Sequence, residues 1–318
     1  MKVFAGSAYK DLTRRICEHL SMPEGLAKIT VFPDSEIFVK IEEDVRGKDV
    51  FIVQPTCDPV NETLMELLIF IDCARRASAR RITAVMPYFS YARQDRKDEG
   101  RVPITAKLVA NMITTAGADR VLTIDLHAGQ IQGFFDIPLD NLYAEPVLSR
   151  YFRSLNLKNV VLVSPDVGSV KRTRSFRQRL EGDMAIIDKA RIDAFETEVG
   201  QMIGNVKGKT VVMIDDMITT AGTMCAAAKL CRAEGAEKIY IGATHGVLCG
   251  PAVERLREAP VDEVVITDTY PIPQSKIDGI GKLTVLSIAE LIGEAMLRIH
   301  KNESVSNLFS MDNGNSGS

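Results

Sequence analysis

An adjacent pair of carboxylates, Asp215 and Asp216, ends a buried apolar run in the segment VVMIDDMITTAGT (211–223). A turn rich in Thr and Gly follows the pair and opens a helix that is rich in alanine. Backbone N–H groups at the start of such a helix, together with the hydroxyls of Thr220 and Thr223, form a cradle that suits a phosphate. Ribose hydroxyls donate hydrogen bonds to carboxylates. The segment therefore predicts a site for a phosphorylated sugar.

The hexapeptide MITTAG occurs twice, at 112–117 and at 217–222. The first copy ends a predicted helix and has no acidic pair before it, which is typical of a structural segment. An acidic strand end followed by an ordinary helix cap would also explain the second copy. Because a strand, an acidic pair and a helix come together around the second copy, we interpret that copy as the site.

Two further segments carry side chains suited to metal or phosphate chemistry. His127 follows a buried strand in TIDLH (123–127), which predicts a position at a strand end facing a cleft, although a lone His is more often a core or surface residue. The run KRTRSFRQR (171–179) packs five basic residues into nine positions. We interpret this run as the first turns of a helix with a solvated outer face, in which Lys171 and Arg172 lie close enough to the preceding loop to help neutralise a diphosphate.

Short β-branched runs alternate with segments of helical period, and this pattern predicts the elements that position these residues. Several runs are continuously apolar and end in Asp, His or Pro, as expected of parallel strands buried on both faces. Helical spacing predicts a helix capped by Asn61, with Leu64, Leu67, Leu68 and Ile71 on a sheet, and a second helix over 105–116 that packs through Leu108, Val109, Met112 and Ile113. The predicted strands lie at 50–55, 81–88, 121–127, 160–166, 184–188, 211–216, 239–245 and 264–269. The fold class is α/β.

The two halves of the chain repeat one pattern. FIVQPT, a helix and ITAVMPY in the first half match VVMIDDMITTAGT, a helix and IYIGATHG in the second, with similar spacing. We therefore predict two similar domains, each with a mostly parallel sheet flanked by helices, at 1–145 and 146–300. The last helix (288–300) is expected to pack back across the interface, and residues 301–318 to form a partly disordered tail.

The segment 211–223 resembles the phosphoribosyl-diphosphate binding loop of phosphoribosyltransferases. Further segments match, in order, the ribose-phosphate diphosphokinase family, whose members make 5-phosphoribosyl diphosphate. These segments are PDSE (33–36), YFSYARQDRK (88–97), TIDLHAGQIQGFF (123–135), SPDVGSVKR (164–172), MAIIDKAR (184–191) and ATHGVLCGPAVERL (243–256). The resemblance covers essentially the whole chain and implies two phosphoribosyltransferase-like domains, a nucleotide side in the first and a ribose 5-phosphate side in the second.

The resemblance also implies roles for individual residues. The diphosphoryl group of ATP would pass to the anomeric hydroxyl of ribose 5-phosphate, with Lys189 and Arg191 on a mobile catalytic loop neutralising the charge that builds up on the transferring group. His127 and Asp166 would contact a Mg²⁺ ion that ATP largely holds. The residues implied for ATP are Phe32, Asp34, Ser35, Glu36, Arg93 and Gln94, and those for ribose 5-phosphate are Arg191, Asp215, Asp216, Thr219, Thr220, Ala221, Gly222 and Thr223.

Two positions depart from the family pattern. Ser35 stands where the family commonly has Gly between two acids, so Glu36 is the firmer of the two carboxylates. Thr219 stands where many members carry Asp, which leaves one carboxylate fewer beside the sugar. A phosphoribosyltransferase that consumes the same product stays an alternative, as does a catalytically weak regulatory homologue of the synthetase. The latter is expected to lack Lys189, Arg191 or His127, and all three are present.

Composition excludes several other classes of protein. A formal charge of −3 over 318 residues leaves no electrostatic footprint for nucleic acid. We expect no membrane partner, because no apolar run reaches the roughly 18 residues of a membrane span, and MKVFAGSAYK lacks the apolar stretch of a signal peptide. A cytoplasmic protein with six reduced, mostly buried cysteines is predicted. The family resemblance adds a homo-oligomer, often a hexamer.

Overall fold

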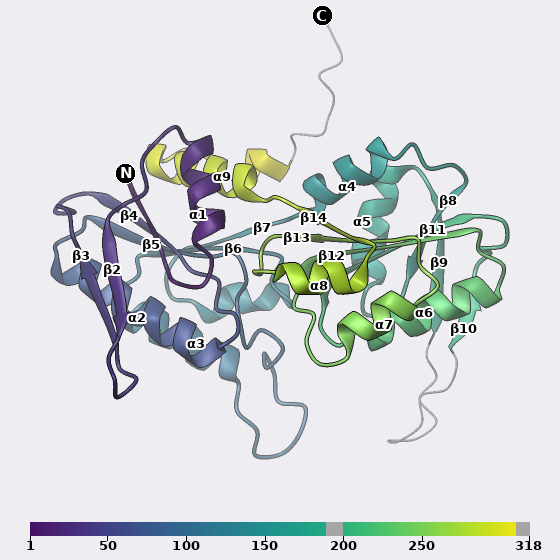
Figure 1. Cartoon of the computed structure of the whole chain (residues 1–318), viewed down its shortest axis with the longest axis horizontal. Coiled ribbons are helices and arrows are strands. Elements are labelled where there is room, and N and C mark those ends of the chain that lie inside the picture. The colour runs from purple at the N-terminus through teal and green to yellow at the C-terminus, as the bar shows by residue number, and fades with distance from the viewer. Residues whose placement is uncertain (189–199, 310–318) are drawn as a thin grey trace, which may run out of the picture. The chain divides into compact units, whose positions relative to one another are not determined.

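The computed structural model describes residues 1–188 and 200–309, and the chain divides into two compact units. The first unit comprises Met1–Tyr143, Thr269–Pro271 and Ile288–Ser318, and the second comprises Ala144–Asp268 and Ile272–Ser287. Each unit has its own mostly parallel sheet with helices packed against it (Figure 1). The predicted α/β class is therefore confirmed.

A parallel five-stranded sheet in the order β1-β4-β5-β6-β7 forms the centre of the first unit. All five residues of β4 are buried, because helices cover both faces of the sheet at its centre. An antiparallel hairpin, β2 with β3, pairs only with itself. The strands are β1 (Lys2–Ala5), β2 (Ala27–Val31), β3 (Ile37–Ile41), β4 (Asp49–Val53), β5 (Arg81–Met86), β6 (Arg120–Ile124) and β7 (Leu139–Leu142).

The helices of the first unit are α1 (Lys10–His19), α2 (Val60–Arg76), α3 (Thr105–Ala116) and α9 (Ala289–Lys301), with 3₁₀ turns η1 (Gly129–Phe134) and η2 (Ser306–Phe309). Leu64, Leu67 and Ile71 of α2 are buried in the core, as the helical spacing predicts. The predicted cap at Asn61 is wrong, since α2 begins at Val60 with Pro59 before it.

Two further expectations about this unit need correction. Leu108 of α3 is 56% exposed, because only Val109 and Ile113 of the predicted apolar set lie fully on the core side of that helix. The sequence assigns residues 288–300 to the second domain, but Ile288–Ser318 belongs to the first unit. The physical reason is that α9 packs against α1, and Figure 1 shows the two helices side by side.

A seven-stranded sheet in the order β10-β9-β8-β11-β12-β13-β14 forms the second unit, parallel except for the edge pair β10 with β9. Its strands are β8 (Val160–Ser164), β9 (Asp183–Asp188), β10 (Gln201–Ile203), β11 (Thr210–Ile218), β12 (Lys238–Gly246), β13 (Glu263–Thr267) and β14 (Leu283–Leu286). Its helices are α4 (Glu145–Ser154), α5 (Val170–Leu180), α6 (Gly222–Ala233), α7 (Ala252–Glu258) and α8 (Gln274–Ile280).

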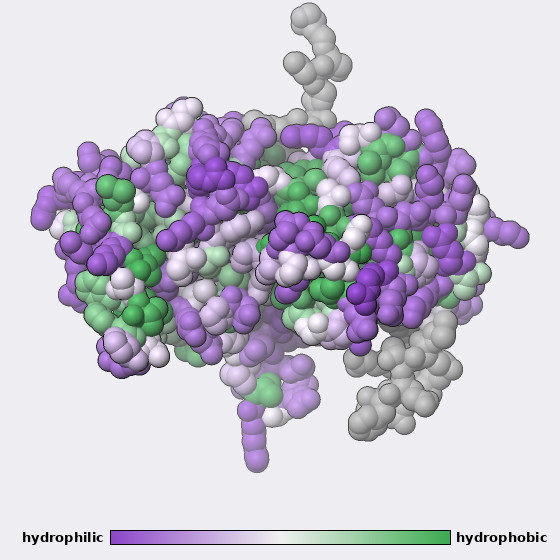
Figure 2. Space-filling view, in the orientation of Figure 1, coloured by the Kyte–Doolittle hydropathy of each residue, from purple (hydrophilic) through white to green (hydrophobic). Residues whose placement is uncertain are grey.

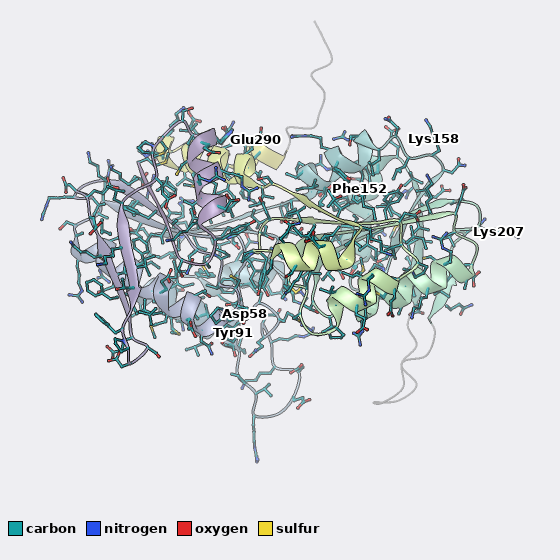
Figure 3. The ribbon with its side chains drawn as sticks, in the orientation of Figure 1. Asp58, Tyr91, Phe152, Lys158, Lys207 and Glu290 are labelled. Carbon is teal, nitrogen blue, oxygen red and sulfur yellow. The ribbon has the colours of Figure 1, made fainter. Side chains whose placement is uncertain are left out.

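One face of this second sheet is closed by aromatic packing. Phe152 of α4, labelled in Figure 3, stands edge-on to Tyr240 of β12 with ring centroids 6.5 Å apart. A Cβ at Gly242 would come within 3.1 Å of the Phe152 ring, so a glycine in β12 allows the ring to lie close to the sheet. The opposite face packs on α6 through Met224, Ala228 and Cys231.

The surface carries two features that bear on the predictions. Apolar side chains reach the surface over the hairpin of β2 and β3 (Figure 2), and the large exposed ones there are Leu26, Val31, Phe32 and Phe38. Four of the cysteines are buried as predicted, whereas Cys249 is exposed in the loop before α7. Within residues 1–188 and 200–309, no helix combines the length and the apolar character needed to cross a membrane.

Candidate active site

The acidic pair lies at the carboxyl edge of the second sheet. In β11, Met213 pairs with Val163 of β8 and Asp215 pairs with Ala243 of β12, so the loops that follow these parallel strands meet at one edge. Asp216 is buried and Asp215 is half-buried. Sequence position thus predicts the placement of the pair correctly.

Burial, followed by the neighbouring charge of Asp216, raises the pKa of Asp215 to about 7. Its Oδ1 accepts two hydrogen bonds, from the backbone N–H of Asp216 over 2.9 Å and from the hydroxyl of Ser169 over 3.2 Å. Arg172 acts in the opposite direction through its charge. Near neutral pH Asp215 therefore exchanges between a carboxyl, which can donate a hydrogen bond, and a carboxylate, which accepts hydrogen bonds such as those of sugar hydroxyls.

The segment 219–221 turns the chain sharply from β11 into α6. Ala221 precedes the helix with φ +61°, in the left-handed region, and no side chain in the described part of the chain caps the helix start. The first N–H groups of a helix have no partner within it and carry its positive dipole end. This uncapped helix start lies at the position where the sequence predicts a phosphate cradle.

The carbonyl groups of this turn are held by the segment after β12. The backbone N–H groups of Leu248 and Cys249 donate to the carbonyls of Ile218 and Thr219, each over 3.0 Å. Nη1 of Arg255 donates to the carbonyl of Thr220 over 3.1 Å. Because these bonds fix the carbonyls of the turn, its N–H groups keep one orientation.

Arg255 is a residue of this site that the sequence reasoning missed. A Cβ at Gly222 would come within 3.2 Å of its Nη1, so the glycine allows the guanidinium to approach the start of α6. A cation here adds to the helix dipole and strengthens the attraction for an anion. The only signal in the sequence is an arginine within ATHGVLCGPAVERL, with no local spacing that links it to the turn.

Asp166 follows β8 in a loop that hydrogen bonds hold on two sides. The hydroxyl of Ser164 donates to the carbonyl of Asp166 over 2.7 Å, and the backbone N–H of Ser169 donates to its Oδ1 over 2.9 Å. The helix predicted from the basic run is α5. Part of that run has a structural role, because Arg179 binds Glu145 of α4 at 2.7 Å.

A pocket of about 460 Å³ in the first unit brings together residues predicted on two separate segments, Arg93 with Gln94 on one and His127 on the other. Its other lining residues are Asp95, Arg96, Asp98, Val102, Pro103, Ala128 and Gln130. The pocket lies between the long loop after β5 and the turn after β6. The long loop after β5 projects from the unit in Figure 1. Its polar, mixed-charge lining suits a polar ligand such as a nucleotide phosphate chain.

Specific hydrogen bonds order the walls of this pocket. The hydroxyl of Thr105 donates to Oε1 of Gln94 over 2.6 Å, and Nε2 of Gln130 donates to Oδ2 of Asp95 over 2.9 Å. The hydroxyl of Tyr91 donates to Asn61 near the start of α2. Figure 3 labels Tyr91 and Asp58 at the same end of the first unit. Asp95 and Gln130 are pocket residues that the sequence reasoning did not select.

The four remaining residues predicted for ATP lie elsewhere in the first unit. Phe32, Asp34, Ser35 and Glu36 form the turn between β2 and β3, whereas the pocket is lined by other segments. The backbone N–H of Phe32 donates to the carbonyl of Glu36 over 2.8 Å, and Ser35 has φ +73°. This is the left-handed region that glycine adopts at least cost, which explains in physical terms why Gly suits this position.

Comparison with known proteins identifies the family. Residues 1–117 match the N-terminal domain of ribose phosphate pyrophosphokinase, and residues 191–310 match the phosphoribosyl synthetase-associated domain. The chain is 57% identical to a ribose-phosphate pyrophosphokinase of Rhodopirellula baltica over 97% of its length and 98% of that protein. It belongs to the ribose-phosphate pyrophosphokinase family.

Other members of the ribose-phosphate pyrophosphokinase family agree with this assignment. The protein of Rhizobium meliloti is 55% identical over 97% of this chain and 100% of its own length. The crystal structure of phosphoribosylpyrophosphate synthetase from Mycobacterium smegmatis superposes with a TM-score of 0.89 at 42% identity, covering 95% of this chain and 99% of that one. The chain is therefore an enzyme of the transferase class.

Some residues predicted from the family resemblance fall where the structure gives no placement. Lys189 and Arg191, predicted as catalytic, lie outside the described residues, as does the tail beyond Phe309. His127 belongs to the first unit and Asp166 to the second. Within residues 1–188 and 200–309, no group of three or more His, Cys, Asp or Glu side chains is arranged to hold a metal ion.

Proposed function

We propose that this member of the ribose-phosphate pyrophosphokinase family transfers the diphosphoryl group of ATP to the anomeric hydroxyl of ribose 5-phosphate. The anomeric oxygen attacks the β-phosphorus of ATP in line, the bond from that phosphorus to the α-phosphate oxygen breaks, and AMP leaves. The anomeric proton passes to solvent or to a phosphate oxygen. The products are 5-phosphoribosyl diphosphate and AMP, and the protein forms no covalent intermediate.

The observation that carries this proposal is the uncapped start of α6 directly after a buried acidic pair. A doubly charged 5-phosphate fits a helix start whose dipole is reinforced by Arg255. Asp215 and Asp216 would accept hydrogen bonds from the ribose hydroxyls, and Thr219, Thr220, Ala221, Gly222 and Thr223 would surround the phosphate.

ATP would occupy the pocket of the first unit. Arg93 offers a planar guanidinium to a phosphate, and Gln94 offers an amide whose oxygen is already bonded to Thr105. That bond leaves the amide N–H groups of Gln94 to an acceptor on the nucleotide. The family resemblance assigns the adenine to an aromatic face and acceptors on the hairpin turn, which does not line this pocket, and the residues so assigned are Phe32, Asp34, Ser35 and Glu36.

Mg²⁺ would accompany ATP, with His127 and Asp166 as its protein contacts. Magnesium prefers oxygen ligands and retains water, so one carboxylate and one imidazole suit an ion whose remaining ligands come from phosphates. The carboxylate of Asp166 fits this role because the backbone N–H of Ser169 and the hydroxyl of Ser164 already order its loop. When bound, the ion would neutralise charge on the transferring phosphates.

Lys189 and Arg191 would stabilise the negative charge on the group in transfer, and Arg191 would also contact ribose 5-phosphate. Neither role requires proton transfer, since both side chains act as fixed cations. The homo-oligomer, with a hexamer as the family expectation, and the cytoplasmic location remain predictions.

The direct test is release of AMP from ATP with and without ribose 5-phosphate. The proposal expects AMP formation that requires both ribose 5-phosphate and Mg²⁺. Lys189→Ala is expected to lower kcat by at least about 10²-fold, as for the loss of one preorganised electrostatic donor. Consumption of 5-phosphoribosyl diphosphate together with a free base, without AMP release from ATP, would indicate a phosphoribosyltransferase instead.

A further inference from the structure

Ser169 stands at the N-cap position of α5 but does not use its side chain as a cap. A serine at this position ordinarily accepts a hydrogen bond from the second or third N–H of the helix. Within the described part of the chain, no side-chain cap bond is formed at the start of α5. The hydroxyl of Ser169 instead donates to Oδ1 of Asp215, 46 positions further along the chain, over 3.2 Å.

The backbone of the same residue contacts a second carboxylate. The N–H of Ser169 donates to Oδ1 of Asp166 over 2.9 Å. Ser169 is 8% exposed, so water competes little for either bond. One buried residue thus donates to two carboxylates, one in the loop after β8 and one near the carboxyl end of β11.

Neighbouring residues fix Ser169 in this arrangement. Its carbonyl accepts the backbone N–H of Thr173 over 2.9 Å and the hydroxyl of Thr173 over 3.0 Å. The residue before Ser169 is Gly168, where a Cβ would come within 3.3 Å of Oδ1 of Asp166. The glycine therefore leaves room for the Asp166 carboxylate beside Ser169. The donor groups of Ser169 therefore have little freedom to point elsewhere.

We propose that Ser169 is a positioning residue that holds the carboxylate of Asp215 in the rotamer that receives ribose, and ties it to the Asp166 loop. This proposal rests on the proposed function of the Asp215 site. A carboxylate with one oxygen engaged by two donors cannot rotate freely about its terminal bond, so its other lone pairs keep a fixed direction. Holding the acceptor in place before the sugar binds removes an ordering cost from binding.

The arrangement also accounts for the forgone cap. A serine cap stabilises a helix modestly. A hydrogen bond to an acidic side chain is the stronger of the two whenever that side chain is ionised. The hydrogen bond to Asp215 therefore stabilises the fold more than a cap of α5 would, and it lies in the proposed substrate site.

The test compares wild-type protein with Ser169→Ala, which removes the hydroxyl and keeps the N–H to Asp166. We expect the Kd for ribose 5-phosphate alone, measured by calorimetry, to rise about 5- to 20-fold. We expect the KM for ribose 5-phosphate to rise in parallel, while the KM for ATP and the half-saturating Mg²⁺ concentration change less than about twofold. Ser169→Thr, which keeps a hydroxyl, should recover most of the affinity.

Ser175→Ala is the matched control, because it also removes a serine hydroxyl that donates to a carboxylate, but the acceptor is Glu145 of α4, outside the Asp215 site. It should lower thermal stability while leaving the Kd for ribose 5-phosphate unchanged. Should Ser169→Thr fail to fold, Ser169→Gly must reproduce the Ser169→Ala loss of affinity.

The outcomes separate the two proposals. An unchanged Kd in Ser169→Ala, or an equal weakening in Ser175→Ala, would overturn the role of Ser169. Ribose 5-phosphate binding to wild type without any AMP release would overturn the proposed reaction while leaving Ser169 to be judged by its effect on Kd. Absence of ribose 5-phosphate binding to the wild-type protein would overturn both.

Discussion

The backbone N–H of Asp216 donates to Oδ1 of Asp215 over 2.9 Å, so a hydrogen bond joins these two adjacent acids. Burial and the charge of Asp216 raise the pKa of Asp215 to about 7, against 3.8 for an ordinary aspartate. Between about pH 3.8 and pH 7, Asp215 therefore keeps its proton in the folded protein and loses it in the unfolded chain. The stability that this proton confers is complete below about pH 3.8 and is lost as the pH rises through about 7.

Asp215→Asn should consequently stabilise the protein at pH 8 and change little at pH 4. The amide imitates the protonated carboxyl, so Tm at pH 8 should rise by at least about 2 °C, which corresponds to roughly 1 kcal/mol in a domain of this size. Scanning calorimetry at both pH values measures this. Asp183→Asn is the control, because Lys209 lowers the pKa of Asp183 and no gain at pH 8 is expected. A lower Tm for Asp215→Asn at pH 8 would contradict the assignment.

Ser35→Gly should stabilise the hairpin of β2 and β3. Ser35 has φ +73°, which costs an L-residue more than it costs glycine, so the gain should be about 0.5–1 kcal/mol. Urea unfolding would measure it. Ala226→Gly, at an exposed position in the middle of α6, should destabilise by a similar amount because glycine is unfavourable inside a helix. Equal destabilisation by both changes would show that the turn at Ser35 is unstrained.

Arg81 should be hard to replace even by lysine. Its Nε donates to Asp49 over 2.7 Å and its Nη2 to the carbonyl of Ile299 over 2.8 Å, which joins the start of β5 to the end of α9. Burial opposes ionisation of Asp49, but hydrogen bonds from Arg81 and His300 prevail, and its pKa is lowered. Lysine cannot make this forked contact, so Arg81→Lys should cost about 1–2 kcal/mol in unfolding free energy.

The control for Arg81→Lys is Arg76→Lys on the surface of α2. Arg76 binds Asp72 at 2.7 Å, but its side chain is 78% exposed, so its replacement should leave Tm nearly unchanged. Similar effects of the two substitutions would mean that the Arg81 contacts do not stabilise the docking of α9.

Thr219 should serve as a hydroxyl that binds the sugar, without acting as a base. A Thr hydroxyl cannot accept a proton at neutral pH, but it keeps a donor and an acceptor. Thr219→Asp should therefore change kcat/KM by no more than about tenfold, or roughly 1.4 kcal/mol, and Asp216→Asn should cost more. A gain of several orders of magnitude in turnover for Thr219→Asp would indicate that the wild-type chain is a weakened, regulatory homologue.

The sequence predicts the interior of both sheets well and their margins poorly. All eight strands expected from apolar runs are present. Strands such as β4 and β11 are almost continuously apolar because both faces of the sheet are covered, and this makes them easy to predict. The strands β1, β7 and β14 were not predicted, because four-residue segments such as KVFA and LTVL carry too little periodicity to be distinguished from loops. The sequence does not predict the hairpin of β2 and β3, because its strands are largely half-buried or exposed and so lack a continuous apolar run.

The candidate site divides in the same way. Asp215 and Asp216 were placed correctly because the direction of a parallel strand fixes where its last residues lie. Arg255 and Ser169 were missed, since each acts on a group far from it in sequence, and local spacing cannot report such a contact. Asn61 has the chemistry of a helix cap, but the hydroxyl of Tyr91 uses its side-chain oxygen.

The most direct test of the proposed reaction follows a label from the β-phosphorus of ATP. With ribose 5-phosphate and Mg²⁺ present, ³²P at the β position should appear in 5-phosphoribosyl diphosphate, while label at the α position should appear only in AMP. Both products should form in equal amounts. Recovery of the β-label in ADP, with or without a phosphorylated sugar, would show that a single phosphoryl group is transferred and would contradict diphosphoryl transfer by this chain.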